Sequence, residues 1–329
     1  MIEAPHVHHQ TRMETTHAQR VCLELAGLRF ALVSADTELP LYVAGAMSRF
    51  VVAADTEADI HINTAWGEPD EHNSERQLFD SGSVWRLYAC ADGGYEFRCA
   101  APFSAWRTYK RARFSADWTR GEILCARRFF DTGAPVYPLE YPLDEVLLSN
   151  LLAAGRGVEL HACAVVDADG SGYLFVGQSG AGKSTTARLW ADEAGVRILS
   201  DERVVLRAAG GRIWMYGTPW HGEAQTFEPA RAPLMKIFCL GRGVRNEVVA
   251  LHPAEAAARL FAASFPPFHS PAGIDFTLAF LAETCSQVEV SELRFVPDER
   301  AVEFVRKQAA VSTACGSGRV YVANRDRTA

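Results

Sequence analysis

The run from Gly177 to Ser184 reads GQSGAGKS and matches the phosphate-binding pattern G-x-x-x-x-G-K-[ST]. Glycines allow backbone N–H groups to point inward at phosphate oxygens, in conformations that a Cβ would block. In such a loop Lys183 reaches the β- and γ-phosphates, and the Ser184 hydroxyl binds Mg²⁺. The sequence therefore predicts a nucleotide site. It comprises Gly177, Gln178, Ser179, Gly180, Ala181, Gly182, Lys183, Ser184 and Thr185.

Two adjacent acids, Asp201 and Glu202, follow this loop at the end of the next apolar run. Phosphoryl transfer needs a carboxylate that holds Mg²⁺, and often one that accepts the proton of the attacking hydroxyl. Asp201 is the expected magnesium-side residue, because its strand should neighbour the strand that enters the loop. Successive strand residues face opposite sides, so Glu202 could instead point to solvent. His161 precedes the loop and is a further candidate catalytic residue. A lone histidine is nevertheless more often structural than catalytic.

The elements around the loop predict an α/β domain with a mixed, largely antiparallel sheet. An apolar strand at 173–176 enters the loop, and a helix at 184–194 leaves it. The next strand, 196–207, is followed by the turn Gly210-Gly211 and a strand at 212–216, which leaves no room for a second crossover helix. Parallel nucleotide-binding folds alternate strand and helix, so this chain departs from them.

The rest of the chain divides by pattern. Alternating apolar residues from 21 to about 134 predict a mostly antiparallel sheet, with turns at 92–94 and 119–121. Downstream we expect a helix from Leu143 that ends at Gly155 or Gly157, and a strand at 158–166. Further strands at 234–240 and 288–296 and helices from Pro253, at 273–287 and at 297–308 complete the prediction. The expected domains are a disordered tail (1–20), a β-rich domain (21–140), a catalytic domain (141–310) and a second tail (311–329).

Composition limits the classes of function. The chain has 329 residues, enough for two domains. Its net charge of −7 and pI of about 5.8 argue against nucleic acid as the main partner. No window reaches the apolar length of a membrane span, and no secretory signal precedes the chain's apolar runs. The eight cysteines form no C-x-x-C pair, so we expect reduced thiols in a cytoplasmic protein.

These motifs together resemble the catalytic domain of HPr kinase/phosphorylase, whose fold is shared with ATP-dependent phosphoenolpyruvate carboxykinase. The resemblance rests on His161, on GQSGAGKS at 177–184 and on SDERVV at 200–205, and it covers 158–220 best. It implies that Asp201 deprotonates an acceptor hydroxyl, that Glu202 assists the metal and that His161 orients the acid. The whole chain looks more like the HPr-kinase-related proteins of bacterial biosynthetic gene clusters.

The sequence departs from the family's pattern at several positions. Glu202 stands where the family has Asp, and Thr185 stands where HPr kinases have Glu. The signature that recognises the protein partner HPr is absent, and YGTPWHGE at 216–223 stands in its place. The β-rich N-terminal half does not resemble the regulatory domain of HPr kinases. The departures make HPr an unexpected substrate for this chain.

Residues 218–223 should leave the sheet near its phosphate end. Trp220, His221 and Glu223 are therefore candidate contacts for the acceptor, although a turn with a packed tryptophan is an equally good interpretation. Arg203 is a further candidate, because a cation beside the site could neutralise charge in the transition state.

The expected function is that of an ATP-dependent, Mg²⁺-requiring kinase. It would transfer the γ-phosphoryl group to a hydroxyl, of serine in a peptide or protein or of a small molecule. A non-catalytic nucleotide-binding switch or scaffold is the alternative from another class. A phosphorylase or phosphatase on the same fold is a third hypothesis. A homo-oligomer stays open, as does a phosphate donor other than ATP.

Overall fold

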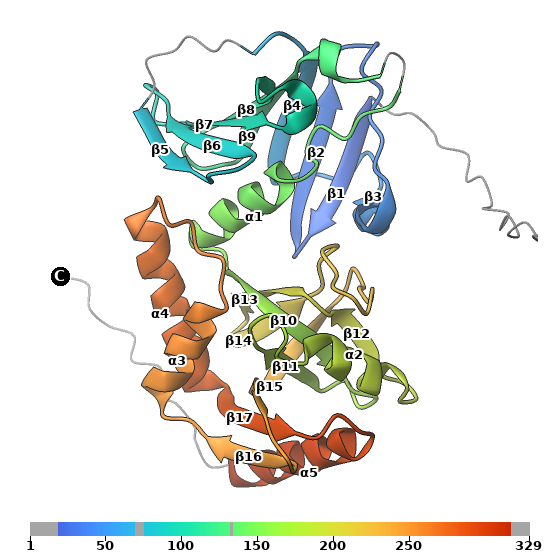
Figure 1. The fold of residues 1–329 in the computed structure, drawn as a ribbon, viewed down its shortest axis with the longest axis vertical. Helices are drawn as coiled ribbons and strands as arrows, with labels where there is room; N and C mark the ends of the chain where they lie inside the picture. Colours follow the sequence, from blue (N-terminus) through green and yellow to red (C-terminus); the bar gives the residue numbers. More distant parts are fainter. Residues whose placement is uncertain (1–18, 70–75, 132–133, 317–329) are drawn as a thin grey trace, which may run out of the picture. The chain divides into compact units, whose positions relative to one another are not determined.

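A computed structural model describes residues 19–69, 76–131 and 134–316, with side chains as far as Ala309. The chain divides into two compact units, each of which contains one sheet (Figure 1). The first unit comprises Met1–Leu23 and Arg29–Asp144, and the second comprises Glu24–Leu28 and Glu145–Ala329. The expected tail at 1–20 lies almost entirely outside the described residues.

The first unit is built on a nine-stranded sheet with the order β3-β1-β2-β4-β9-β8-β7-β6-β5. Its strands are β1 (Arg20–Leu25), β2 (Leu28–Ser34), β3 (Val51–Val52), β4 (Ile60–Trp66), β5 (Arg76–Asp80), β6 (Trp85–Ala89), β7 (Tyr95–Ala100), β8 (Thr108–Phe114) and β9 (Arg120–Cys125). Short 3₁₀ turns lie at Gly45–Phe50, Pro102–Ser104 and Arg127–Phe129.

Most of this sheet matches the expected antiparallel arrangement. Strands β5 to β9 form an antiparallel meander, and the predicted turn between β6 and β7 is confirmed by Gly93 with φ 83°. Strand β4 differs, because it runs parallel to both β2 and β9. The last strand of the meander, β9, pairs with β4, and no local pattern in the sequence encodes this long-range pairing. The turn expected at 119–121 lies earlier, since β9 already begins at Arg120.

The second unit contains a mixed sheet, as predicted, and this sheet has eight strands. Its order is β11-β10-β13-β14-β15-β17-β16, with β12 paired to β10 and β11 paired in parallel to β15. The β15–β17 pair is also parallel, whereas β10 pairs antiparallel with β11, β12 and β13, and the pairs β13–β14, β14–β15 and β16–β17 are antiparallel. The strands are β10 (Val158–Val166), β11 (Gly172–Val176), β12 (Arg197–Ser200), β13 (Arg203–Ala209), β14 (Arg212–Tyr216), β15 (Arg231–Arg242), β16 (Glu247–Ala250) and β17 (Glu289–Phe295).

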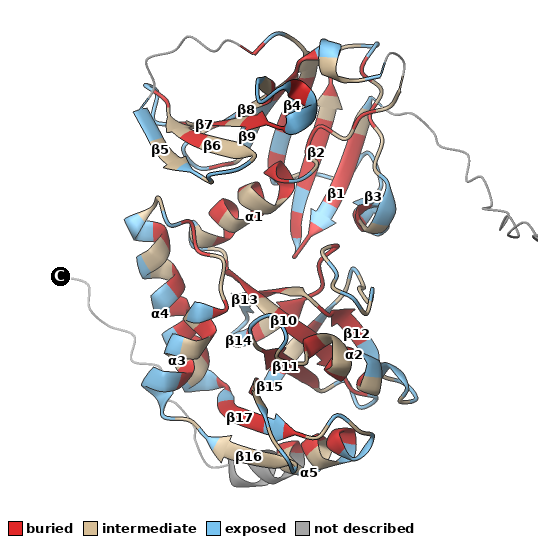
Figure 2. Ribbon diagram, in the orientation of Figure 1, coloured by how far each residue is buried: buried red, intermediate tan, exposed pale blue. Residues whose placement is uncertain are grey.

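Helices cover both faces of this sheet, so its central strands are apolar on both sides. Alternate residues of β10 enter two separate cores. Leu160 and Ala162 pack toward α3 (Pro253–Ala262) and α4 (Pro271–Gln287), whereas Cys163 and Val165 pack toward α2 (Lys183–Ala191) and α5 (Arg300–Gly316). Figure 2 shows the resulting buried strands. The helices are α1 (Leu143–Ala153), α2 (Lys183–Ala191), α3 (Pro253–Ala262), α4 (Pro271–Gln287) and α5 (Arg300–Gly316).

The second unit differs from expectation in three places. The strand expected at 196–207 is two strands, β12 and β13, and Asp201 and Glu202 occupy the break between them. Strand β16 was not expected. Helix α5 continues to Gly316, into residues that we expected to form a tail. In the described part of the chain, no helix combines the length and hydropathy needed to cross a membrane.

One ion-pair cluster joins α5 to the turn after β10. Arg306 donates to both carboxylate oxygens of Asp167 at 2.9 and 2.8 Å, and to Glu193 at 2.7 Å. The hydrogen bonds from Arg306 hold the pKa of Asp167 below its ordinary value. A depressed folded-state pKa contributes stability above the unfolded pKa of about 4, and this contribution is lost as the pH falls through the folded value.

Replacing Asp167 with asparagine is therefore expected to lower the free energy of unfolding by about 1–3 kcal/mol at pH 7, since charge-assisted hydrogen bonds are lost. The deficit should shrink as the pH falls below about 4. Urea unfolding of both proteins across this pH range measures it. Glu303→Gln is the matched control, because the Glu303–Lys307 pair on the same helix is 70% exposed on both sides and should contribute nothing measurable. Equal losses of unfolding free energy in the two variants would contradict the stabilising role of the Arg306–Asp167 pair.

Candidate functional site

The glycine loop joins β11 to α2 in a conformation that requires its glycines. Gly180 has φ 77°, and Gly182, the residue before the helix, has φ 106°. Both values lie in the left-handed region that residues with a Cβ rarely adopt. A Cβ on Gly177 would lie 2.6 Å from that of Ala181, so the loop is also too tight for a larger residue. The first N–H groups of α2 have no partner within the helix, and they favour an anion at this position.

Lys183 is buried beneath this loop. Only 5% of the residue is exposed, and its Nζ donates to the carbonyl oxygens of Gly177 at 3.0 Å and Gln178 at 3.2 Å. Burial lowers the pKa of Lys183, while the carboxylates of Glu202 and Asp201 act in the opposite direction. Two carbonyl oxygens of the loop thus hold the ammonium group inside it.

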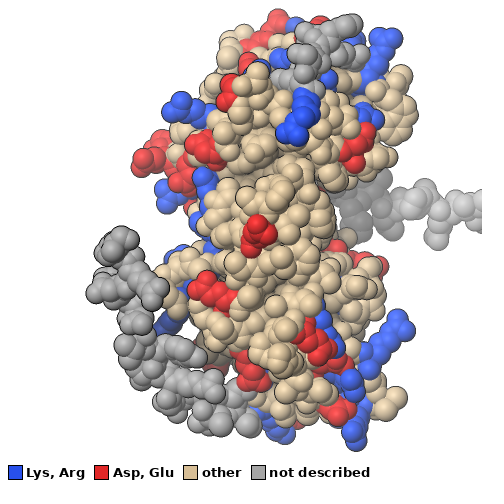
Figure 3. Space-filling model, turned by 90° about the vertical axis from the view of Figure 1, so that its left-hand side faces the viewer, with Lys and Arg blue, Asp and Glu red and all other residues tan. Residues whose placement is uncertain are grey.

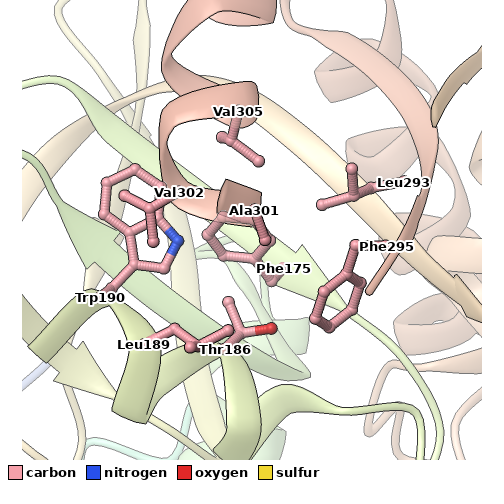
Figure 4. Close-up of a pocket in the computed structure, with 9 residues that line it drawn as sticks. All are labelled: Phe175, Thr186, Leu189, Trp190, Leu293, Phe295, Ala301, Val302 and Val305. Atoms are coloured by element: carbon pink, nitrogen blue, oxygen red, sulfur yellow. The ribbon is translucent and has the colours of Figure 1, made fainter. Parts of the chain in front are cut away.

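The packing of α2 fixes the position of the loop. Figure 4 shows a small pocket lined by Leu189 and Trp190 of α2, by Phe175 of β11 and by side chains of β17 and α5. Thr186 is the polar member of this lining, and its hydroxyl donates to the carbonyl oxygen of Gly182 at 3.0 Å. The pocket is therefore a gap in the apolar core behind the loop, and its lining offers little for a polar ligand.

His161 and Glu202 form a close pair next to the loop. His161 Nε2 lies 2.8 Å from Glu202 Oε1, with side-chain exposures of 20% and 36%. Burial and the Lys183 charge lower the pKa of His161, against the raising effect of Glu202. The lowered pKa favours the neutral imidazole, whose Nε2–H can donate to the carboxylate. Glu202 thus points toward the site, although the sequence alone left a solvent-facing orientation open.

Asp201 occupies a different environment. It is fully buried, and its Oδ1 and Oδ2 accept hydrogen bonds from the backbone N–H groups of Gly222 and Ala224, each at 2.9 Å. The expected roles of Asp201 as proton acceptor and magnesium ligand are not favoured here, since both oxygens already have donors and solvent does not reach them. Asp201 instead holds the segment between β14 and β15.

The position of Asp201 follows from the sheet order. Strand β12 was expected beside the loop strand, and this expectation is wrong: β10 lies between β11 and β12. The chain leaves the ladder after Ser200, and the Glu202 carbonyl oxygen then accepts from Ala162 N–H at 3.0 Å. This irregularity directs the two neighbouring acids to different surroundings.

Arg203 is engaged in a partly buried network of two carboxylates and two aromatic rings. Its guanidinium lies 3.0 Å from Glu145 and 3.3 Å from Glu159, and its Cζ lies 4.2 Å from the centroid of the Phe265 ring. The Trp220 ring centroid lies 6.0 Å from the same Cζ. Because two carboxylates already compensate its charge, Arg203 is poorly suited to the predicted contact with the acceptor.

The other candidate contacts lie on the segment that Asp201 holds. His221 is exposed and stacks on Phe227, with ring centroids 5.2 Å apart. Glu223 is also exposed, and its carboxylate lies 3.9 Å from Arg188 of α2. The segment therefore runs close to α2 at Glu223, whereas Trp220 is half-buried near Arg203.

Gly222 was missed by sequence reasoning, although its neighbours were considered. It donates to Asp201 and lies against Glu202, so it connects the two acids to the segment. The only signal in the sequence was a glycine between two polar residues, which is also typical of an ordinary turn.

On the face drawn in Figure 3, acidic and basic side chains are interspersed over each unit. Within the described residues, no group of three or more His, Cys, Asp and Glu side chains is arranged to hold a metal ion.

The likeness of this chain to known proteins is structural. No model of a known protein family matches the chain, and no curated protein matches its sequence. Among solved structures, the HPr(Ser) kinase/phosphatase from Coxiella burnetii matches with 11% sequence identity and a TM-score of 0.29. The match covers 47% of this chain and 98% of that one. The likeness is a distant one at the level of the fold.

Proposed function

We propose that the protein is a Mg²⁺-requiring kinase that transfers the γ-phosphoryl group of ATP to a hydroxyl group. The observation that carries this proposal is the 2.8 Å pair of His161 and Glu202 next to the phosphate loop that buries Lys183. A phosphate loop alone supports nucleotide binding. A carboxylate that is oriented by a neutral histidine beside it supports proton transfer from an acceptor.

The residues present fit a nucleoside triphosphate with its metal. The loop N–H groups and Lys183 would hold the phosphates, and Ser184, in the first turn of α2, would bind Mg²⁺ together with Glu202 or through water. Magnesium commonly uses one or two protein ligands plus phosphate oxygens, so a larger protein cluster is not required. The ion would neutralise charge that develops on the phosphates.

Glu202 is the proposed proton acceptor, in place of Asp201. In the transfer, the acceptor oxygen bonds to the γ-phosphorus, the bond from that phosphorus to the bridging oxygen breaks, and the hydroxyl proton passes to Glu202. His161 keeps the carboxylate oriented through Nε2–H. The acceptor would be a serine of a peptide or protein, or a small molecule with a hydroxyl group.

Nucleotide turnover by purified protein tests the proposal. ADP release should require Mg²⁺ and should rise when hydroxyl-bearing peptides or small molecules are supplied. Tight binding of Mg-ATP without turnover, under any acceptor, would instead support a nucleotide-binding switch or scaffold. Release of phosphate from a phosphorylated acceptor without added ATP would support the phosphatase hypothesis.

A further inference from the structure

The backbone approaches the two acids most closely at Gly222. Its N–H donates to Asp201 Oδ1 at 2.9 Å. A Cβ built on Gly222 would lie 2.9 Å from Asp201 Oδ2 and 2.9 Å from Glu202 Oε2. The φ angle of Gly222 is not in the left-handed region, so space rather than backbone conformation requires the glycine. Because Gly222 has no side chain, the space beside the Glu202 carboxylate stays open.

The two carboxylates would respond differently to an added Cβ. Asp201 is fully buried and bonded to two backbone N–H groups, so it cannot shift without releasing both. Glu202 has a longer side chain that is 36% exposed, and its carboxylate is held by the contact with His161 and by attraction to Lys183 and Arg203 rather than by backbone donors. A methyl group at position 222 would therefore push Glu202 away from His161 before it moved Asp201.

We propose that Gly222 is a positioning residue that keeps the space beside Glu202 Oε2 open for the acceptor hydroxyl. The inference rests on the proposed function. Oε1 is engaged by His161, so an incoming proton would go to Oε2. A general base must lie about 2.6–3.2 Å from the oxygen that it deprotonates. A Cβ on residue 222 would lie 2.9 Å from Glu202 Oε2 and would therefore occupy the place of that oxygen. Asp201 supports this arrangement, because its two hydrogen bonds fix the backbone on either side of position 223.

The pKa of His161, followed by NMR titration, tests the positioning without any assay of activity. Glu202 raises the pKa of His161, so a displaced carboxylate must lower it. Gly222→Ala is expected to shift the pKa of His161 in the same direction as Glu202→Gln. Gly67→Ala is the matched control, because this glycine also lacks a left-handed φ and the atoms nearest to an added Cβ belong to the flexible Leu124 side chain. A parent-like His161 pKa in folded Gly222→Ala protein would overturn the inference.

Asp201→Asn supplies a second test that does not depend on the folding of Gly222→Ala. The asparagine amide group would face one of the two backbone donors, so one hydrogen bond is lost. Amide hydrogen exchange at Gly222 and Ala224 should accelerate about 10–100-fold, the equivalent of one hydrogen bond to a charged group. Parent-like protection of both amides would show that Asp201 does not hold the segment, and would overturn the inference.

Turnover separates this inference from the proposed function. In an active parent protein, Gly222→Ala should lower kcat about 10²-fold and leave the KM for ATP unchanged, as loss of general-base catalysis does. Parent-like kcat in that variant would contradict the positioning role alone. An inactive parent protein that nevertheless shows the expected shift of the His161 pKa would contradict the proposed kinase function and leave the geometry intact.

Discussion

Replacing Glu202 with glutamine is expected to lower the rate of phosphoryl transfer by about 10²–10⁴-fold, the usual contribution of a general base. Glutamine keeps the size of the side chain and an oxygen that can accept from His161 Nε2–H, but it cannot take up a proton. The affinity for nucleotide should change little, because the phosphates are held by the loop and Lys183. Steady-state turnover and equilibrium binding of Mg-ATP measure the two effects separately.

The neighbouring acid provides the matched comparison for this variant. Asp201→Asn removes the charge of a fully buried residue whose oxygens hold Gly222 and Ala224. It should reduce the free energy of unfolding by about 1–3 kcal/mol, as expected for the loss of a hydrogen bond to a charged group. Glu202→Gln should not, since that side chain is partly exposed. Parent-like transfer by Glu202→Gln, together with loss of transfer in a stable Asp201→Asn protein, would return the role of base to Asp201.

Replacing Lys183 with methionine is expected to lower kcat about 10²–10³-fold, comparable to the loss of one electrostatic contact to the transition state. Methionine fills much of the same buried volume, so the loop should keep its shape while the charge on the phosphates loses its partner. Nucleotide affinity should fall as well, because Lys183 also contacts the ground-state phosphates. Calorimetric titration with Mg-ATP, combined with turnover, measures both losses.

Lys307→Met is the control for this substitution. Lys307 lies on α5, is 70% exposed and pairs with Glu303, so its loss should affect neither binding nor turnover. If Lys183→Met bound Mg-ATP and turned it over as the parent protein does, the glycine loop would not be a phosphate site.

Local patterns in the sequence were sufficient for much of the second unit. The apolar run at 158–166, the glycines at the end of α1 and the loop pattern each specify an element by its own residues, and β10, α1 and α2 lie where expected. The mixed sheet could be predicted from the length of the segment after α2, because this segment is too short for a crossover helix. These inferences needed no knowledge of distant contacts.

The features that could not be predicted depend on long-range contacts. The parallel course of β4 is determined by its pairing with β9, which lies far along the chain. The break between β12 and β13 depends on β10, and it assigns Asp201 and Glu202 to different environments. Residue types alone indicated two acids beside a phosphate loop. The hydrogen bonds of Asp201 to the segment after β14 distinguish the two, and no spacing in the sequence encodes them.

The most direct test of the account is phosphorylation of a serine-containing peptide library by the parent protein and by Glu202→Gln, read by mass spectrometry. With Mg-ATP, the parent protein should add a phosphoryl group to a subset of peptides. Glu202→Gln should bind Mg-ATP equally well and yield phosphopeptides at least about 10²-fold more slowly. Equal rates of phosphorylation by the two proteins would contradict the assignment of Glu202 as the base on which the proposed mechanism depends.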